Sequence, residues 1–296
     1  AATAKPFGMN LFVLEQPTPD AATVQAAIDR LAPLYADLGL PPPEAPARWC
    51  EDFHAQFEAL LEARPTVASF TFGILSAAQV RRLQDEAGCY VIGTATTLAE
   101  AQAWAAVGAD AVVASGMEAG GHRGTFLGDF EASMVGTLAL VPQCVDALSI
   151  PVIAAGGIMD GRGIAAAQAL GAQGVQLGTA FLACPESAIG PAQRVAMADA
   201  QATDTRVTRI YSGRPARGIV NTLMQRLAPH EATVPAYPVQ NALTGPLRKA
   251  AASQGRADYL SLWAGQGVAA ARALPAQQLV ALLAQEWQAA LQRLKV

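Results

Sequence analysis

The chain has 296 residues, of which 52% are hydrophobic and 15% are charged. Apolar content this high excludes a disordered or fibrous protein. The net charge of −4 and the lack of a basic stripe argue against nucleic acid as a partner. No run reaches the roughly 18 apolar residues of a membrane-spanning helix, and no signal peptide is recognisable. We therefore predict a cytoplasmic α/β protein without a membrane partner.

The cysteines and histidines do not have the spacing of metal ligands. The cysteines are Cys50, Cys89, Cys144 and Cys184. They are dozens of residues apart, and disulfide frameworks are typical of small secreted chains, so we expect reduced, buried thiols. The histidines, at positions 54, 122 and 230, do not pair at zinc-ligand spacing, and we expect no metal site.

Short apolar runs alternate along the chain with amphipathic helical patterns. The runs that predict buried parallel strands are residues 7–13, 66–72, 89–93, 110–115, 151–155 and 174–177. The helices between them start at residue types that cap helix N-termini. These caps are Asp20, Asp52, Ser76, Thr97 and Asp160. Four of the helices end near a glycine, at positions 39, 88, 108 and 171.

Repeated βα units in one chain predict a parallel sheet. A closed (β/α)8 barrel needs eight strands, whereas six are visible, and two more units would add about 60 residues. We expect a (β/α)8 TIM barrel whose first two βα units are missing from the sequence; an open sheet is the alternative.

The alternating strand and helix pattern ends at about residue 187. Residues 1–187 carry the six strand patterns, whereas residues 188–296 contain proline-rich loops and a predicted final helix at 276–294. We expect this second segment to pack on the side or rim of the barrel and to complete the same domain without an independent core.

Two glycine-rich segments follow the fifth and sixth predicted strands, at the ends where α/β proteins place their sites. They are A-A-G-G-I at 154–158 and Q-L-G-T at 176–179. Glycines let the backbone approach a ligand closely, and neighbouring amides can bind an anion. Each segment alone could be only a tight turn, but the two on adjacent strands favour a phosphate site.

A third glycine-rich segment, G-M-E-A-G-G-H-R-G at 116–124, places His122 in a loop. Histidine exchanges a proton near neutral pH, which suits acid/base chemistry beside a cofactor, although a structural histidine is the alternative. For Glu118 in the same loop we favour hydrogen bonding to loop amides over the role of a base. We expect His54 to be structural. The two arginines of S-G-R-P-A-R-G at 212–218 could bind a phosphate or form a salt-bridged turn.

Taken together, these segments resemble the nitronate monooxygenase family, formerly called 2-nitropropane dioxygenases. The resemblance rests on residues 116–124, on P-V-I-A-A-G-G-I-M-D-G-R-G at 151–163 and on G-V-Q-L-G-T-A-F-L-A-C-P-E-S at 174–187. Residues 6–12, 212–218 and L-W-A-G-Q-G at 262–267 fit as well. The histidine motif is shared with flavin-dependent enoyl-ACP reductases and quinone reductases, so it indicates the superfamily better than the substrate.

The resemblance implies a TIM barrel that binds FMN. By position, Asn10 would hydrogen-bond the flavin, Gly120 would back its ring, and His122 would stand near its reactive face. The ribityl chain and phosphate would be held by Gly157, Gln176, Leu177, Gly178 and Thr179. Ser115 stands where many relatives have Gln, which would shorten or remove that flavin contact. The family also begins with two strands that are not recognisable here.

The implied reaction is FMN-dependent oxidation of an alkyl nitronate by O2 to a carbonyl compound and nitrite. A neutral His122 would remove the α-proton of a nitroalkane, whereas a protonated one would stabilise the anionic substrate or flavin; the sequence leaves both open. One alternative is an NAD(P)H-dependent flavin reductase of a quinone or enoyl thioester. Another is a degenerate flavin- or phosphate-binding barrel without turnover. The oligomeric state stays open.

Overall fold

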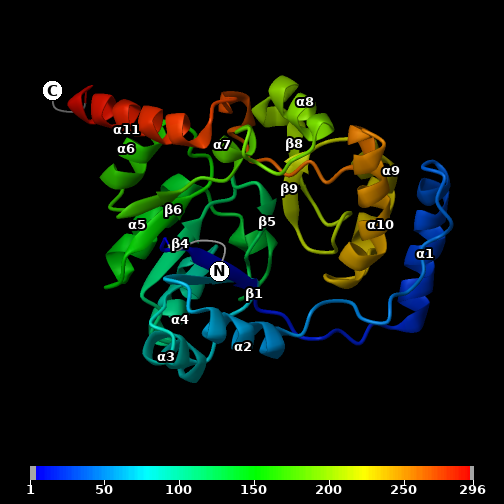
Figure 1. Ribbon diagram of the computed structural model, residues 1–296, viewed down its shortest axis with the longest axis horizontal. Coiled ribbons are helices and arrows are strands. Elements are labelled where there is room, and N and C mark those ends of the chain that lie inside the picture. The colour runs from blue at the N-terminus through cyan, green and yellow to red at the C-terminus, as the bar shows by residue number, and fades with distance from the viewer. Residues whose placement is uncertain (1–4, 294–296) are drawn as a thin grey trace.

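A computed structural model describes residues 5–293 (Figure 1). Its main sheet has six parallel strands in the order β1-β2-β3-β4-β6-β7. They are β1 (Gly8–Phe12), β2 (Val67–Thr71), β3 (Tyr90–Ala95), β4 (Ala111–Ser115), β6 (Val152–Ala155) and β7 (Gly174–Gln176). All six strands predicted from apolar runs are confirmed, as is their parallel pairing with sequential neighbours.

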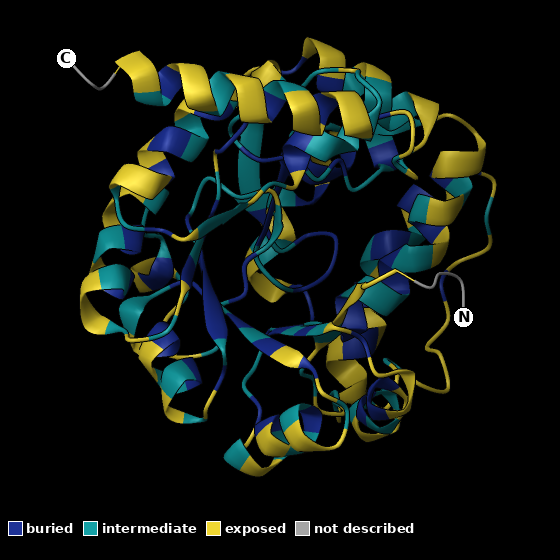
Figure 2. Cartoon of the chain, turned by 60° about the vertical axis from the view of Figure 1, so that its left-hand side comes forward, coloured by how far each residue is buried: buried dark blue, intermediate teal, exposed yellow. Residues whose placement is uncertain are grey.

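Strands β1 and β7 depart from the prediction of buried strands: four of the five residues of β1 are exposed, and no residue of β7 is buried. In the described part of the chain β1 pairs with β2 alone, and β7 lies at the opposite edge of the sheet. The inner strands are buried and are surrounded by helices whose outward faces are exposed (Figure 2). That two further βα units belong to the fold stays a prediction.

Of the helices that alternate with the strands, all but α5 begin at the predicted caps; α5 begins after Gly136, which provides no side-chain cap. They are α2 (Phe53–Ala63), α3 (Ala77–Asp85), α4 (Leu98–Ala106), α5 (Thr137–Ala147) and α6 (Gly161–Ala169). The side chains of Asp52, Ser76, Thr97 and Asp160 each accept a hydrogen bond from a first-turn amide, which satisfies a donor that has no intrahelical partner.

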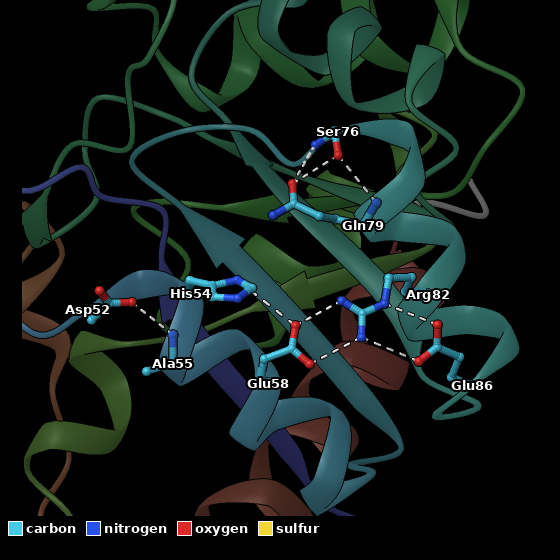
Figure 3. A network of polar contacts seen from close by, with 8 residues as sticks. All are labelled: Asp52, His54, Ala55, Glu58, Ser76, Gln79, Arg82 and Glu86. Atoms are coloured by element: carbon cyan, nitrogen blue, oxygen red, sulfur yellow. Dashed lines mark hydrogen bonds and ion pairs between the residues drawn. The ribbon is translucent and has the colours of Figure 1, made fainter.

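Helices α2 and α3 are joined on their outer faces by an ion network (Figure 3). The Arg82 guanidinium donates to both carboxylate oxygens of Glu58, at 2.8 and 3.1 Å, and to Glu86 at 3.0 Å. His54 lies 3.9 Å from Glu58 with its side chain 82% exposed. Because the network is in contact with solvent, it contributes at most about 1 kcal/mol per pair and serves to orient the helices.

Helix α1 (Ala21–Ala36), capped by Asp20 as predicted, packs on α10 (Val239–Ser253). Its apolar face joins a second hydrophobic cluster with residues from α9 (Thr222–Leu227) and from the segment around Tyr211. The buried side chains of residues 188–296 in this cluster pack together with those of α1, from the first part of the chain. That this segment completes the same domain without an independent core stays a prediction. A domain boundary at residue 187 stays a prediction.

The rest of the C-terminal segment lies along the carboxyl ends of the strands and over α6. It contains α8 (Pro191–Asp199) and α11 (Ala276–Arg293), which packs on α6, and it follows the short helix α7 (Thr179–Leu182). The predicted final helix is thus confirmed up to Arg293, and Leu294 lies outside the described residues. A small antiparallel sheet, which the sequence did not predict, has the order β5 (Gly121–His122), β9 (Ala216–Ile219), β8 (Thr205–Thr208).

The four cysteines are free, as predicted, but Cys50 is only partly buried while the other three are buried. Among residues 5–293, no helix is long and apolar enough to cross a membrane.

The contact between Gly93 of β3 and Trp104 of α4 offers a test of the packing. A Cβ at Gly93 would lie 2.0 Å from the Trp104 ring, which is fully buried. We expect Gly93→Ala to lower the free energy of unfolding by about 1–3 kcal/mol, measured by urea denaturation. The matched control is Gly245→Ala inside α10, where a Cβ meets no atom within 4 Å. It should be neutral or stabilising by up to about 1 kcal/mol; equal losses in both variants would contradict the packing.

Candidate active site

A cavity of about 300 Å³ lies at the carboxyl ends of the parallel strands. Every strand of the main sheet contributes to its lining, through Asn10, Thr71, Thr94, Ser115, Ala155 and Gln176. Its volume is at the lower end of the range of about 300–1,000 Å³ found for ligand sites. The cavity is therefore where an α/β barrel places its active site.

The two glycine-rich segments predicted to form a phosphate site meet in this cavity. Gly156, Gly157, Gly178 and Thr179 all line it. The amides of Gly157, Gly178 and Thr179 donate no hydrogen bond to another described residue. A Cβ at Gly178 would touch no protein atom within 4 Å, so the backbone there is open to a ligand. Unpaired amides from neighbouring strand ends are what an anion requires.

The other residues predicted to contact a flavin fall into two groups. Asn10, Ser115, Gly120 and Gln176 line the cavity, whereas Leu177 does not: its side chain packs in the hydrophobic core around β6, α6 and α11. Alternation along β7 explains the difference, because successive side chains point to opposite faces. A role for Leu177 is thus confined to its backbone.

The segment L-W-A-G-Q-G closes the cavity from the C-terminal side, a function that the sequence did not reveal. Gly265 and Gly267 line the cavity. The hydroxyl of Thr179 accepts a hydrogen bond from the Gly265 amide at 2.9 Å. A Cβ on Gly120 would come within 2.4 Å of the Gly265 nitrogen, so glycine is needed where the two loops cross.

His122 lines the same cavity, but it belongs to strand β5 and not to a loop as predicted. It pairs with Ala216 of β9, a partner 94 residues further along the chain. Its ring is surrounded by three aromatic side chains, with ring centroids at 5.4 Å for Phe72, 5.7 Å for Tyr237 and 5.3 Å for Trp263. The Nε2 atom lies 2.8 Å from the hydroxyl of Ser212.

The surroundings of His122 keep its imidazole neutral. Burial, together with the smaller effect of the positive charges of Arg214 and Arg248, lowers the pKa of His122 to about 4. A neutral imidazole can accept a proton at pH 7, whereas an imidazolium cannot. Of the two states that the sequence left open, the structure therefore favours the neutral one.

Phe72, next to His122, has a strained backbone. Its φ angle is 77°, a left-handed conformation that costs a bulky residue of order 1–3 kcal/mol. The conformation places the ring against Phe12, at a centroid distance of 4.3 Å, and beneath the Arg214 guanidinium at 4.1 Å. The strain thus fixes an aromatic wall of the site.

The arginines near the histidine segment bind backbone carbonyls and not carboxylates. Arg123 donates to the carbonyls of Ser115 and Gly116, at 2.8 and 2.7 Å, and Arg217 donates to that of Met117 at 3.1 Å. Arg214 donates to the carbonyl of Arg123 at 3.0 Å. A salt-bridged turn is not observed for Arg214 and Arg217, because their guanidiniums bind backbone carbonyls of the histidine segment. A phosphate contact by these arginines stays a prediction.

Two carboxylates, of Glu118 and Glu100, connect the histidine segment and the loop after it to the surrounding structure. Glu118 accepts hydrogen bonds from the amide and hydroxyl of Thr137 at 2.9–3.0 Å, which confirms that it binds amides. Glu100 is fully buried and accepts from the amides of Phe126 and Leu127 at 2.5 and 2.9 Å. Its carboxylate is thus directed to the loop that follows His122 and to the backbone and hydroxyl of Thr96.

The nitronate monooxygenase family model matches residues 1–286. A probable nitronate monooxygenase of Staphylococcus aureus is 43% identical over 94% of this chain and 78% of its own length. The chain belongs to the nitronate monooxygenase family. Members of this family are flavin-dependent oxidoreductases, so the chain is an enzyme of that class.

Solved structures agree with the nitronate monooxygenase assignment. Nitroalkane oxidase from Streptomyces ansochromogenes is 42% identical, with a TM-score of 0.90 over 99% of this chain and 83% of that one. FabK from Thermotoga maritima is 29% identical, with a TM-score of 0.73 over 99% of this chain and 79% of that one. These likenesses assign the fold to the predicted α/β TIM-barrel class. Among residues 5–293, no group of three or more His, Cys, Asp or Glu side chains could hold a metal ion.

The neutral state of His122 can be tested by titration of this nitronate monooxygenase homologue. We expect the imidazole to take up a proton near pH 4, followed by NMR with ¹⁵N-labelled histidine. Because protonation is favoured in the unfolded chain, where histidine titrates near 6.5, stability falls as the pH drops from about 6.5 towards 4, by up to about 3 kcal/mol. His122→Gln should lose less stability over this range. A midpoint near 6.5 in the folded protein would contradict the burial argument.

Proposed function

We propose that this protein uses FMN to oxidise alkyl nitronates with O2, giving a carbonyl compound and nitrite. The observation that carries the proposal is one cavity that joins the free amides of Gly157 and Gly178 to the neutral imidazole of His122. The substrate is a small molecule, a nitronate or a nitroalkane, and O2 is the second substrate.

The residues of the cavity fit FMN. The amides of Gly157, Gly178 and Thr179 are suited to its phosphate, since they are unpaired and lie at adjacent strand ends. Asn10 offers its amide NH2 group, because its Oδ1 already accepts from Ser69 at 3.0 Å. Gln176 and Ser115 add polar groups, and Gly120 leaves space for a ring. When bound, FMN supplies the redox chemistry, and the protein supplies orientation and charge.

His122 is proposed to act as a general base on neutral nitroalkanes. The α-carbon–hydrogen bond breaks, the proton moves to the imidazole, and the electron pair moves onto the nitro group to give a nitronate. A nitronate supplied as such needs no base. The positive charges of Arg214 and Arg248, which act on His122, would also stabilise the nitronate anion that forms.

The aromatic side chains around His122 indicate how polar the substrate is. Phe72, Tyr237 and Trp263 present apolar surface beside the base. Such surface suits an alkyl chain and excludes water from the imidazole, which keeps the base neutral. We therefore propose apolar nitroalkanes as the substrate class.

The likeness to FabK keeps a flavin reductase as the second candidate, but at 29% identity it is weaker than the 42% shared with nitroalkane oxidase. Anaerobic mixing separates the two. We expect the purified protein to be yellow with releasable FMN, and an alkyl nitronate alone to bleach the flavin absorbance in a stopped-flow spectrometer. Rapid bleaching by NADH or NADPH, with none by the nitronate, would favour the reductase.

A variant tests the base directly. His122→Ala should retain FMN, because the phosphate contacts lie on other loops, and should lose turnover of neutral nitroalkanes by about 10²–10⁴-fold, the usual share of a general base. Turnover of the preformed nitronate should fall much less. His54→Ala, a histidine on the outer face of α2, is the matched control. Full activity of His122→Ala on nitroalkanes would exclude this histidine as the base.

A further inference from the structure

The hydroxyl of Ser212 lies between the imidazole of His122 and a tight turn of the S-G-R-P segment. We propose that Ser212 is a positioning residue that fixes the tautomer of His122. Nε2 then carries the proton, and Nδ1 is the nitrogen that receives the α-proton of the substrate. The use of Nδ1 rests on the proposed function, whereas the tautomer itself does not.

The hydrogen bonds of Ser212 identify the tautomer. Its Oγ lies 2.8 Å from His122 Nε2, 3.2 Å from the carbonyl oxygen of Arg214 and 3.3 Å from the amide nitrogen of Arg214. A carbonyl can only accept and an amide can only donate, so the hydroxyl donates to the first and accepts from the second. The remaining lone pair of Oγ faces Nε2, which must then be the donor.

The opposite tautomer removes a hydrogen bond inside the turn. If the Ser212 hydroxyl donated to Nε2, the carbonyl of Arg214 would lose its donor, and no other described residue donates to it. Ser212 is only 1% exposed, so solvent has little access to its hydroxyl. The tautomer with the proton on Nε2 keeps all three hydrogen bonds of this hydroxyl, which favours it.

The turn that carries Ser212 is rigid. Gly213 has a φ of 83°, and a Cβ there would lie 2.1 Å from the carbonyl oxygen of Pro235, so only glycine fits. Its amide donates to the carbonyl of Arg209 at 2.7 Å. The guanidinium of Arg214 is bound to the carbonyl of Arg123, next to His122. The turn therefore fixes the position of the Ser212 hydroxyl relative to the imidazole of His122.

Nδ1 is the nitrogen left for chemistry. It has no hydrogen-bond partner among the described residues, and His122 lines the cavity. When the α-carbon–hydrogen bond breaks, its proton bonds to Nδ1 and its electron pair moves onto the nitro group. The Nε2 proton stays on its bond to Ser212 throughout, so the step requires no rearrangement of hydrogen bonds.

The first test reads the tautomer without reference to activity. In the ¹⁵N-histidine-labelled holoenzyme near pH 7, His122→Gln assigns the signal among the three histidines. We expect wild type to show a protonated Nε2 and a bare Nδ1. Ser212→Ala should give a mixture of both tautomers, and Ser212→Thr, which keeps the hydroxyl, should restore the wild-type pattern. A wild-type spectrum with the proton on Nδ1 would overturn the proposal, even if Ser212→Ala does not fold.

The second test compares kcat/KM for nitroethane with that for its preformed nitronate. Ser212→Ala should lower the nitroethane value roughly tenfold, since a misplaced base loses part of its effect, and leave the nitronate value within about twofold. Ser133→Ala is the matched control: Ser133 is also 1% exposed, and its hydroxyl donates to the carbonyl of Phe130 at 2.7 Å. It should not change the ratio.

The outcomes separate the two proposals. Equal losses on both substrates in Ser212→Ala would contradict the positioning role. A wild-type enzyme that turns over neither substrate would contradict the proposed function, and the NMR spectrum would still decide the tautomer.

Discussion

The geometry of the site depends on buried charges that bind backbone groups and not one another. Arg123 and Arg217, exposed by only 2% and 5%, donate to carbonyls of the segment that leads to His122. Buried Glu100 and partly buried Glu118 accept from amides near the two ends of this segment. A buried charge that loses its partners is expensive, so each of these groups resists movement of the backbone that it holds. The histidine segment, although rich in glycine, is thereby fixed.

The same arrangement sets the electrostatics of the cavity. Arg123, Arg214 and Arg217 donate hydrogen bonds to carbonyl oxygens, and none of them forms a salt bridge with a described carboxylate. Together with burial, the charges of Arg214 and Arg248 hold the pKa of His122 low. One environment thus keeps the imidazole of His122 neutral and favours an anion in the cavity. These two properties are those required by a base that converts a nitroalkane into a nitronate.

The site is assembled from both parts of the chain. The parallel strands supply the polar floor and the glycine amides, while the C-terminal segment supplies Ser212, Tyr237 and Trp263 around the imidazole. Strand β5, only two residues long, joins the two parts through its pairing with β9. The C-terminal segment also contacts the glycine loops, because the Gly265 amide donates to the Thr179 hydroxyl.

What the sequence determined by itself is local. Apolar runs identified six strands, and Asp52, Ser76 and Asp160 marked helix starts, because strand burial and capping depend on neighbours a few residues away. The glycine motifs also indicated where a phosphate would bind, since strand ends of one sheet must meet at one edge. Tertiary structure alone decided the packing of α1 on α10, the pairing of His122 with Ala216, and its contact with Ser212. These contacts join residues 90 or more positions apart, so no short sequence pattern contains them. The same holds for the low pKa of His122, which burial and the distant Arg214 and Arg248 produce.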